Sequence, residues 1–211
     1  MVKIKICGLT SEQDIESVNK ALPDYIGFVF AKSRRQVDEN RAKELKKRLS
    51  PHIKAVGVFV NEEPERIINL CRNKIIDLVQ LHGDEDEDYI RHLRCHIPNK
   101  IIRAVRVKEP ADIEKAADFS CDYLLLDAFD EKEYGGTGKT FDWSMISAVN
   151  RPFFLAGGIN SGNAVRAIKH CRPYCIDVSS GVETGGCKDR DKIKEIVAIV
   201  RQFTTEDIKD T

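Results

Sequence analysis

Short apolar runs rich in β-branched residues alternate with longer amphipathic segments along the whole chain. A short apolar run bounded by turn residues is typical of a buried strand, whereas apolar residues three and four positions apart favour a helix with one buried face. On these criteria we expect eight strands, at residues 3–6, 25–30, 54–60, 77–81, 101–107, 122–126, 153–156 and 175–178.

The segments between these runs carry the signals that begin helices. Ser11 with Asp14 fits a capping box, in which each of the two residues satisfies a backbone N–H of the other. Pro64 and Pro110 stand where the first turn of a helix tolerates proline. Helical spacing continues over residues 143–149 and in the final apolar stretch, so a helix is expected after each strand.

Eight strand–helix units predict parallel strands joined by crossover helices, and eight such strands can close on themselves. We therefore expect an α/β protein with the (β/α)8 TIM-barrel fold, forming a single domain over residues 1–211. The alternative is an open doubly wound sheet, which would carry a glycine-rich turn after the first strand. Cys7, Gly8, Leu9 and Thr10 stand there instead, and the glycine clusters come late in the chain.

Charge and composition exclude several classes of binding partner. The 34 basic and 34 acidic residues cancel, so no overall basic field exists to hold nucleic acid or an anionic membrane. No apolar run approaches the roughly 20 residues that span a bilayer, and the N-terminal segment lacks the apolar core of a secretory signal. The seven cysteines include no C-x-x-C pair, which argues against a metal cofactor. We expect a cytoplasmic protein with a small-molecule substrate.

Chemistry in this fold is located at the carboxyl ends of the strands. Cys7, His82 and Asp127 follow the first, fourth and sixth runs. A thiolate can accept a proton from carbon, and a carboxylic acid can give one to a sugar oxygen, so Cys7 and Asp127 suggest a base and an acid. The alternatives are a buried structural thiol for Cys7 and a helix cap or ion pair for Asp127. His82 is expected to line the substrate or to be a hydrogen-bonded structural residue.

Two glycine-containing segments follow the seventh and eighth runs and predict a phosphate site. Gly157 and Gly158 belong to one, and Ser180 and Gly181 to the other. Glycine lets a ligand approach the backbone closely, and barrels commonly hold phosphate above these two strands. The alternative is a pair of ordinary tight turns.

The loop after the second run offers a cation for a carboxylate. Arg34 and Arg35 are adjacent, so in an extended loop they point in different directions and one is expected to enter the site. A guanidinium there would pair with a carboxylate through two hydrogen bonds. The other arginine is expected to remain in solvent.

The run at residues 135–140 resembles a nucleotide-binding P-loop but fails its pattern, because Glu133 stands five residues before Gly138. We interpret this segment as a mobile loop that closes over a ligand at the end of the sixth strand and excludes water. Gly136 is the position at which a proline would test that interpretation.

Taken together, the motifs resemble those of the phosphoribosylanthranilate isomerase family, the barrel enzymes of tryptophan biosynthesis. The matching segments are KICGLT at 5–10, GFVF with SRRQV within 27–37, VQLHGDE at 79–85, LLLDAF at 124–129, YGGTGKTFDW at 134–143, LAGGIN at 155–160, and DVSSGVE with GCKD within 177–189. They cover the chain in order, and KICGLT together with GGTGKTFDW is specific.

The resemblance implies a cofactor-free Amadori rearrangement of N-(5'-phosphoribosyl)anthranilate to 1-(2-carboxyphenylamino)-1-deoxyribulose 5-phosphate. It implies that Asp127 is the general acid that opens the ribose ring and that Cys7 is the general base that removes the C2' proton. It assigns the anthranilate carboxylate to Arg35 and the phosphate to the backbone around Gly158, Ser180 and Gly181. The chain is expected to act as a monomer or a homodimer.

One departure affects the arginines. Many members of the family carry a proline before the position of Lys32, where this chain has Ala31 in a loop that is shorter than theirs. The choice between Arg35 and Arg34 as the carboxylate ligand therefore stays open.

Three other functions are weighed against this resemblance. The analogous isomerase of histidine biosynthesis uses an aspartate where this chain has Cys7, and its barrel is visibly duplicated. Indole-glycerol-phosphate synthase has a longer N-terminal extension and catalytic lysine and glutamate residues. A phosphate-binding sensor without activity would share the fold, since fold alone does not determine function. Retention of both Cys7 and Asp127 argues against a sensor.

Overall fold

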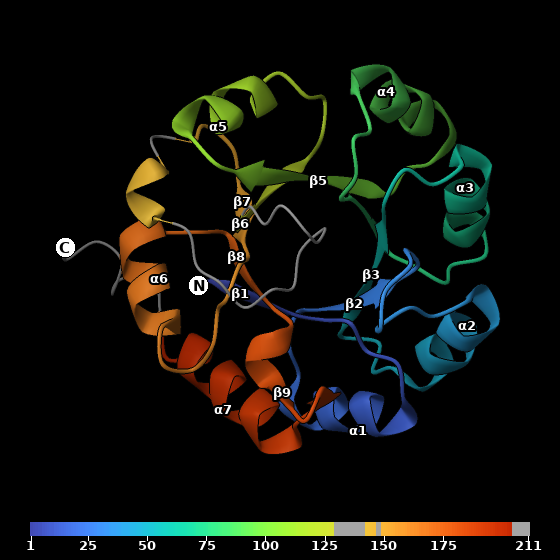
Figure 1. Cartoon of the computed structure of the whole chain (residues 1–211). Helices are drawn as coiled ribbons and strands as arrows, with labels where there is room; N and C mark the ends of the chain where they lie inside the picture. Colours follow the sequence, from blue (N-terminus) through green and yellow to red (C-terminus); the bar gives the residue numbers. More distant parts are fainter. Residues whose placement is uncertain (129–141, 147–148, 204–211) are drawn as a thin grey trace.

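Eight parallel strands form the centre of the protein. The computed structural model describes residues 1–128, 142–146 and 149–203 (Figure 1). Each strand pairs with the next along the chain, and β8 pairs with β1 to close the barrel, as the sequence predicted. The strands are β1 Lys3–Cys7, β2 Tyr25–Val29, β3 Lys54–Phe59, β4 Leu78–Leu81, β5 Lys100–Val107, β6 Tyr123–Ala128, β7 Phe153–Leu155 and β8 Cys175–Val178.

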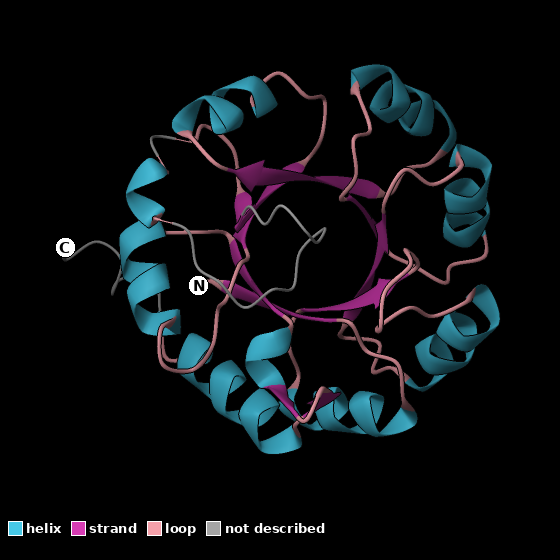
Figure 2. Cartoon of the chain, in the orientation of Figure 1, coloured by secondary structure: helices cyan, strands magenta, loops and turns pink. Residues whose placement is uncertain are grey.

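Helices form an outer ring around the strands (Figure 2). The capping box of Ser11 and Asp14 begins the first helix, and Pro64 and Pro110 begin the third and fifth, as predicted. The α-helices of the described residues are α1 Glu12–Ala21, α2 Glu39–Arg48, α3 Pro64–Arg72, α4 Glu87–His96, α5 Pro110–Ala116, α6 Ala164–Cys171 and α7 Arg190–Arg201.

The connection between β6 and β7 differs from the expected helix. Its described part contains one 3-10 turn, η1 Trp143–Met145, in which Asp142 accepts a hydrogen bond from the backbone of Ser144. Ile146 has a ψ of 82°, which is outside the helical range, so the backbone leaves the turn there. Residues 147–148 lie outside the described residues.

A small hairpin that the sequence analysis did not predict follows β8. It begins after the 3-10 turn η2 Ser180–Val182 and pairs β9 Glu183–Thr184 with β10 Cys187–Lys188. Gly185 and Gly186 join the two strands with φ angles of 60° and 85°. Two successive positive φ angles are typical of a tight hairpin turn and explain the glycine pair.

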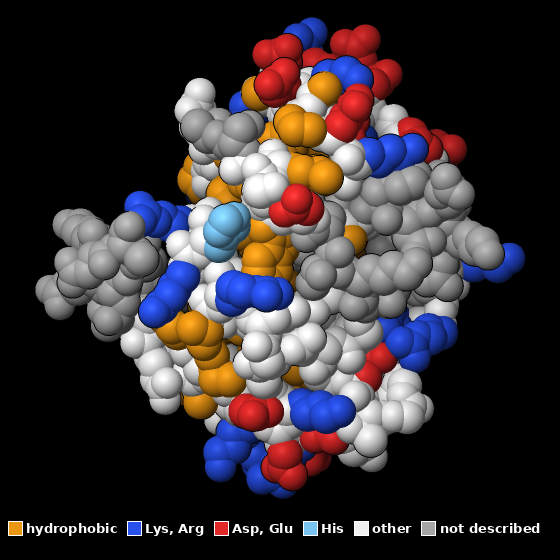
Figure 3. Space-filling model, turned by 60° about the vertical axis from the view of Figure 1, so that its left-hand side comes forward, with side chains coloured by type: hydrophobic (Ala, Val, Ile, Leu, Met, Phe, Trp, Pro, Cys, Tyr) orange, Lys and Arg blue, Asp and Glu red, His pale blue; other side chains and the backbone are white. Residues whose placement is uncertain are grey.

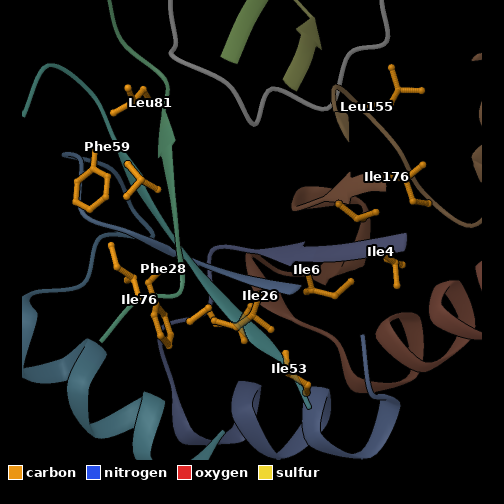
Figure 4. Close-up of a cluster of buried hydrophobic side chains, with 14 of the residues drawn as sticks. Ile4, Ile6, Ile26, Phe28, Ile53, Phe59, Ile76, Leu81, Leu155 and Ile176 are labelled. Carbon is orange, nitrogen blue, oxygen red and sulfur yellow. The ribbon is translucent and has the colours of Figure 1, made fainter. Parts of the chain in front are cut away.

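Two apolar layers hold the barrel. Outward strand side chains pack against the helices, and Figure 4 shows part of this layer, including Ile4, Ile26 and Phe28, all of which are fully buried. Inward side chains of the strands form a second cluster, which includes Tyr25, Leu125 and Phe154. Alternation of side chains along each strand separates the two layers. Several inward positions nearer the carboxyl ends of the strands are polar and form the candidate site.

The surface carries charges of both signs. Basic and acidic side chains lie interspersed on the face shown in Figure 3, with small apolar groups between them. Among the described helices, none has the length and apolar character that crossing a membrane requires.

Candidate active site

Three predicted site residues lie inside the barrel at the carboxyl ends of their strands. Cys7 is the last residue of β1, Asp127 is next to last in β6, and His82 directly follows β4. All three are buried. Because β4 and β6 are not neighbours in the sheet, the contact between His82 and Asp127 crosses the interior of the barrel.

Asp127 is held by contacts from both sides. Its Oδ2 lies 3.3 Å from Nε2 of His82, and its Oδ1 accepts a hydrogen bond of 2.9 Å from the backbone of Ala128. Gly157 lies against this carboxylate with a φ of +84°, and a Cβ there would be 3.2 Å from Oδ1 and 2.8 Å from the Ala128 nitrogen. Gly157 therefore leaves room for the Asp127 carboxylate. The sequence predicted only a phosphate contact for this glycine.

A buried lysine lies below these groups. Lys5 is fully buried and donates hydrogen bonds of 2.8 Å to both Gln80 and Asp177. Burial alone lowers the pKa of Lys5, but the charge of Asp177 and its hydrogen bond to Lys5, with Cys7 adding when it is a thiolate, outweigh burial and raise this pKa above its ordinary value. Lys5 is therefore a permanent positive charge in the barrel interior.

Cys7 is a thiol at rest. Burial raises the pKa of Cys7 above its ordinary value; the negative charge of Asp177 adds to this effect, and the positive charge of Lys5 opposes it. Gly27 on the neighbouring strand makes room for the sulfur, because a Cβ at that position would lie 2.6 Å from Sγ. The site therefore holds Cys7 in a fixed place beside a cation that favours its thiolate.

Both adjacent arginines contact a single carboxylate, that of Glu183. Arg35 donates from Nε and Nη2 to its two oxygens at 2.7 and 3.1 Å, and Arg34 donates from Nη2 at 2.6 Å. The expectation that the two would point in different directions is wrong, because the backbone at residues 33–35 turns instead of remaining extended. Gln36 donates to the Ser33 carbonyl across this turn at 3.1 Å.

The two arginines differ in how far their side chains are exposed. The side chain of Arg35 is 14% exposed, whereas that of Arg34 is 55% exposed. Arg35 also crosses directly over Gly8 at the end of β1, where a Cβ would lie 2.4 Å from its Cδ. Arg35 is thus the more buried of the two arginines and lies over the carboxyl end of β1.

A third cation, Lys188, also contacts the Glu183 carboxylate. Lys188 donates to it at 2.8 Å and also to the Ser179 carbonyl at 2.9 Å. Burial raises the pKa of Glu183, but hydrogen bonds from Arg35 and Lys188 outweigh burial and lower it to about 2. Glu183 is therefore ionised throughout the neutral range and fixes the guanidinium of Arg35.

The two glycine segments of the predicted phosphate site are in contact. Gly181 lies so close to the loop after β7 that a Cβ would be 2.0 Å from the Ile159 carbonyl oxygen. Gly158 has a φ of 64°, and its carbonyl accepts hydrogen bonds from the side chains of Asn160 and Asn163. Ser180 begins η2 beside Gly181. The structure thus brings Gly158, Ser180 and Gly181 to one edge of the barrel mouth.

Sequence reasoning missed Lys5, Gln80, Asp177, Glu183 and Lys188. A signal existed for the first of these, because Lys5 is a charged residue between isoleucines in a strand whose other face is apolar. The Gly-Gly pair at 185–186 was a signal for the hairpin that carries Glu183. No signal along the chain indicated which of these side chains would meet.

Two further expectations concern a lid and a metal. The loop interpreted as a lid falls within residues 129–141, which lie outside the described residues. In the part of the chain that is described, no three His, Cys, Asp or Glu side chains come together in a group that could hold a metal ion.

Comparisons with known proteins identify the family of the chain. A family model described as N-(5'phosphoribosyl)anthranilate (PRA) isomerase matches residues 4–199. An N-(5'-phosphoribosyl)anthranilate isomerase of Endomicrobium trichonymphae is 51% identical over 203 residues, which span 96% of this chain and 100% of that protein.

Solved structures give the same result. The phosphoribosyl anthranilate isomerase of Thermotoga maritima has a TM-score of 0.85 and 37% identity over 96% of this chain and 100% of that chain. A phosphoribosyl anthranilate isomerase in complex with reduced 1-(o-carboxyphenylamino)-1-deoxyribulose 5-phosphate has a TM-score of 0.82 and 36% identity, with the same coverage. The resemblance of the motifs is thereby confirmed, and this barrel belongs to the N-(5'-phosphoribosyl)anthranilate isomerase family.

Proposed function

We propose that the chain catalyses the Amadori rearrangement of N-(5'-phosphoribosyl)anthranilate to 1-(2-carboxyphenylamino)-1-deoxyribulose 5-phosphate, the third step of tryptophan biosynthesis from chorismate. One observation carries the proposal beyond family membership. A thiol and a carboxyl group that can serve as base and acid, Cys7 and Asp127, are both buried at the carboxyl end of one barrel interior. The reaction requires one group of each kind.

Asp127 opens the ring. In its protonated form it gives its proton to the furanose oxygen while the C1'–oxygen bond breaks. The lone pair of the anthranilate nitrogen then forms the C1'=N double bond, which leaves a protonated Schiff base. The contacts of Asp127 with Ala128 and His82 hold the carboxyl group in one orientation during this transfer.

Cys7 then removes the C2' proton as a thiolate. The electrons of the broken C–H bond form a C1'=C2' double bond, and the Schiff-base electrons return to nitrogen, giving an enolamine that tautomerises to the ketone. Burial keeps Cys7 protonated at rest, so its thiol first gives its proton to water. The nearby Lys5 and the positive Schiff base are the charges that favour the thiolate at this stage.

Arg35 binds the anthranilate carboxylate, and His82 lines the substrate. Glu183 accepts from Nε and one Nη2 hydrogen of Arg35. A guanidinium has five N–H groups, so the edge formed by Nη1 and the second Nη2 hydrogen is left for a second carboxylate. Burial and the crossing over Gly8 support Arg35 over Arg34 for this role.

The substrate phosphate is assigned to the backbone around Gly158, Ser180 and Gly181, with Gly157 at the edge of this site beside Asp127. The contact between the two loops supports this assignment, because a phosphate at that edge would be reached by both of them. The edge lies above β7 and β8, where barrels commonly bind phosphate. No cofactor is needed by the reaction as written.

We also infer that the protein acts as a single barrel domain on a small molecule, in the cytoplasm, as a monomer or a homodimer. A biosynthetic enzyme of this family supports the location. Sedimentation velocity at several protein concentrations distinguishes the two oligomeric states.

The experiment is a fluorescence time course with freshly prepared phosphoribosylanthranilate. We expect the wild type to convert it, and Cys7→Ala and Asp127→Asn each to lose roughly a hundredfold to ten-thousandfold in kcat. Circular dichroism and thermal unfolding establish that each variant is folded. A folded wild type that converts nothing would overturn the proposal, and the histidine-pathway aminoaldose would be the next substrate to assay.

A further inference from the structure

A continuous row of buried polar side chains crosses the barrel interior from β8 to β6. Asp177 accepts from Lys5, Lys5 donates to Gln80, Gln80 meets Nδ1 of His82, and His82 faces Asp127. The three hydrogen bonds are each 2.8 Å long, and all five side chains are buried. The row therefore connects a permanent cation to the carboxyl group proposed as the acid.

Lys5 determines which way the amide of Gln80 faces. An ammonium group has only donors, so the group of Gln80 that meets it must be the carbonyl oxygen. Turning the amide over would put its NH2 group against the ammonium of Lys5, which places donor against donor in a site without exposure to water. The NH2 group of Gln80 is thereby directed at Nδ1 of His82.

His82 must then accept at Nδ1. A ring nitrogen that accepts a hydrogen bond carries no proton, so in a neutral imidazole the proton is on the other nitrogen, Nε2. We propose that Lys5 and Gln80 hold His82 as the neutral Nε2–H tautomer, and that His82 in this form is a positioning residue that directs an N–H group at Asp127 and cannot take its proton. This inference rests on the proposed role of Asp127 as the acid.

The geometry at Nε2 supports this role. Nε2 lies 3.3 Å from Oδ2 of Asp127, and no hydrogen bond satisfies it among the described residues although it is buried. Its proton is therefore available to Asp127 or to a substrate oxygen bound beside Asp127. A buried polar atom directed into the interior is a group that a ligand would complete.

The tautomer matters because imidazole is ordinarily more basic than a carboxylic acid. A histidine with a free lone pair beside Asp127 would take the acid's proton and leave a carboxylate that cannot protonate the ribose oxygen. With Nε2 already protonated and Nδ1 occupied by the amide, His82 has no site for that proton. His82 therefore does not compete with the substrate for the proton of Asp127.

The tautomer is measured directly by long-range proton–nitrogen correlation spectra of protein labelled at histidine. The chain has 5 histidines, and His82→Gln identifies the His82 signal by its loss. We expect the wild-type signal to show a protonated Nε2 and an unprotonated Nδ1. A signal with a protonated Nδ1, neutral or charged, would overturn the inference.

Gln80→Glu keeps the shape of the side chain but reverses the direction of the hydrogen bond between residue 80 and Nδ1 of His82. The new carboxylate accepts from Lys5 with one oxygen and from a protonated Nδ1 of His82 with the other. We expect the His82 signal to change to a form protonated at Nδ1, and kcat to fall about tenfold or more with KM within about threefold. Gln13→Glu, which adds the same charge on exposed α1, is the control and should leave both constants unchanged.

A conservative pair tests the donor itself. His82→Gln can place an amide NH2 group near the position of Nε2, whereas His82→Leu cannot, so the glutamine variant should retain more of the wild-type kcat. Full kcat in a Gln80→Glu protein whose His82 signal has changed would overturn the role of the tautomer. Failure of the proposed reaction would appear separately, as a wild type that shows the expected tautomer and converts nothing.

Discussion

The two ends of the barrel interior are lined by different kinds of side chain. At the amino ends of the strands, aromatic rings fill the space: Tyr123 lies 5.5 Å from Phe154 between centroids, and Tyr25 lies 5.6 Å from Phe154. At the carboxyl ends, the inward positions carry Lys5, Gln80, Asp177, His82 and Asp127. Strand β6 supplies both ends, with Tyr123 and Asp127 on the same face. Single strands thus carry an aromatic, packed end and a polar end that we propose to be catalytic.

The largest expected effects come from one substitution at each end. Phe154 is fully buried, and Phe154→Ala should lower the free energy of unfolding by about 3–5 kcal/mol because it leaves a cavity among the rings. Asp127→Asn, already expected to lose most of its kcat, keeps the side-chain volume and should change this free energy far less. Urea unfolding of both proteins, with kcat measured on each, checks the separation.

The contrast between the two ends of the barrel would be wrong if either substitution changed both the free energy of unfolding and kcat in the way expected of the other. A stable Phe154→Ala protein with greatly reduced kcat would mean that the aromatic end positions the acid. A strongly destabilised Asp127→Asn protein would mean that the polar end carries the fold.

A smaller effect distinguishes side chains within the carboxyl end by their burial. Arg35→Ala should raise KM roughly tenfold to hundredfold, because a charge-assisted contact with the substrate carboxylate is lost. Arg34→Ala removes a more exposed partner of the same Glu183 and should change KM by less than about threefold. Initial rates over a range of substrate concentrations measure both, and the reverse order would assign the carboxylate to Arg34.

The smallest effect concerns acid stability at the mouth of the barrel. The folded state holds the pKa of Glu183 at about 2 against an ordinary 4.5, so the folded state binds this proton more weakly than the unfolded chain does. The stabilisation from Glu183 is present above pH 4.5 and is lost as pH falls toward 2. Wild type should therefore have a higher unfolding temperature than Glu183→Gln at neutral pH, with a gap that narrows over that range.

Glu44→Gln on exposed α2 is the matched control for that measurement. Its unfolding temperature should stay close to that of the wild type at every pH. A gap between wild type and Glu183→Gln that stayed constant down to pH 2 would show that Glu183 contributes nothing through its ionised form.

Local pattern was sufficient to predict the barrel and the two positions that we propose as base and acid. Each strand is an apolar run bounded by polar residues, and the rule that chemistry lies at strand ends then selects Cys7 and Asp127. Nothing more than the order of residues along the chain was needed for either step. The proline and capping signals worked for the same reason, since each acts within one helical turn.

The remaining contacts depend on distances that appear only after the barrel closes. Lys5 on β1 meets Gln80 on β4 through the interior, and no local signal fixes that register. Arg35 and Glu183 come together because the turn after β2 and the hairpin after β8 flank the end of β1, which pairs with both strands. The close approach of Gly157 to Asp127 is a further contact of this kind, which the glycine pair in the sequence did not indicate.

The cluster around Glu183 has a consequence for how fast a ligand arrives. Arg34, Arg35 and Lys188 surround one carboxylate, so this cluster of described side chains keeps a surplus of two positive charges at the mouth of a protein whose net charge is zero. A molecule with a carboxylate at one end and a phosphate at the other is drawn toward such a surplus before any contact is made. Its association rate constant should therefore fall as ionic strength rises, while an uncharged probe of the same size would associate at a rate that salt leaves unchanged.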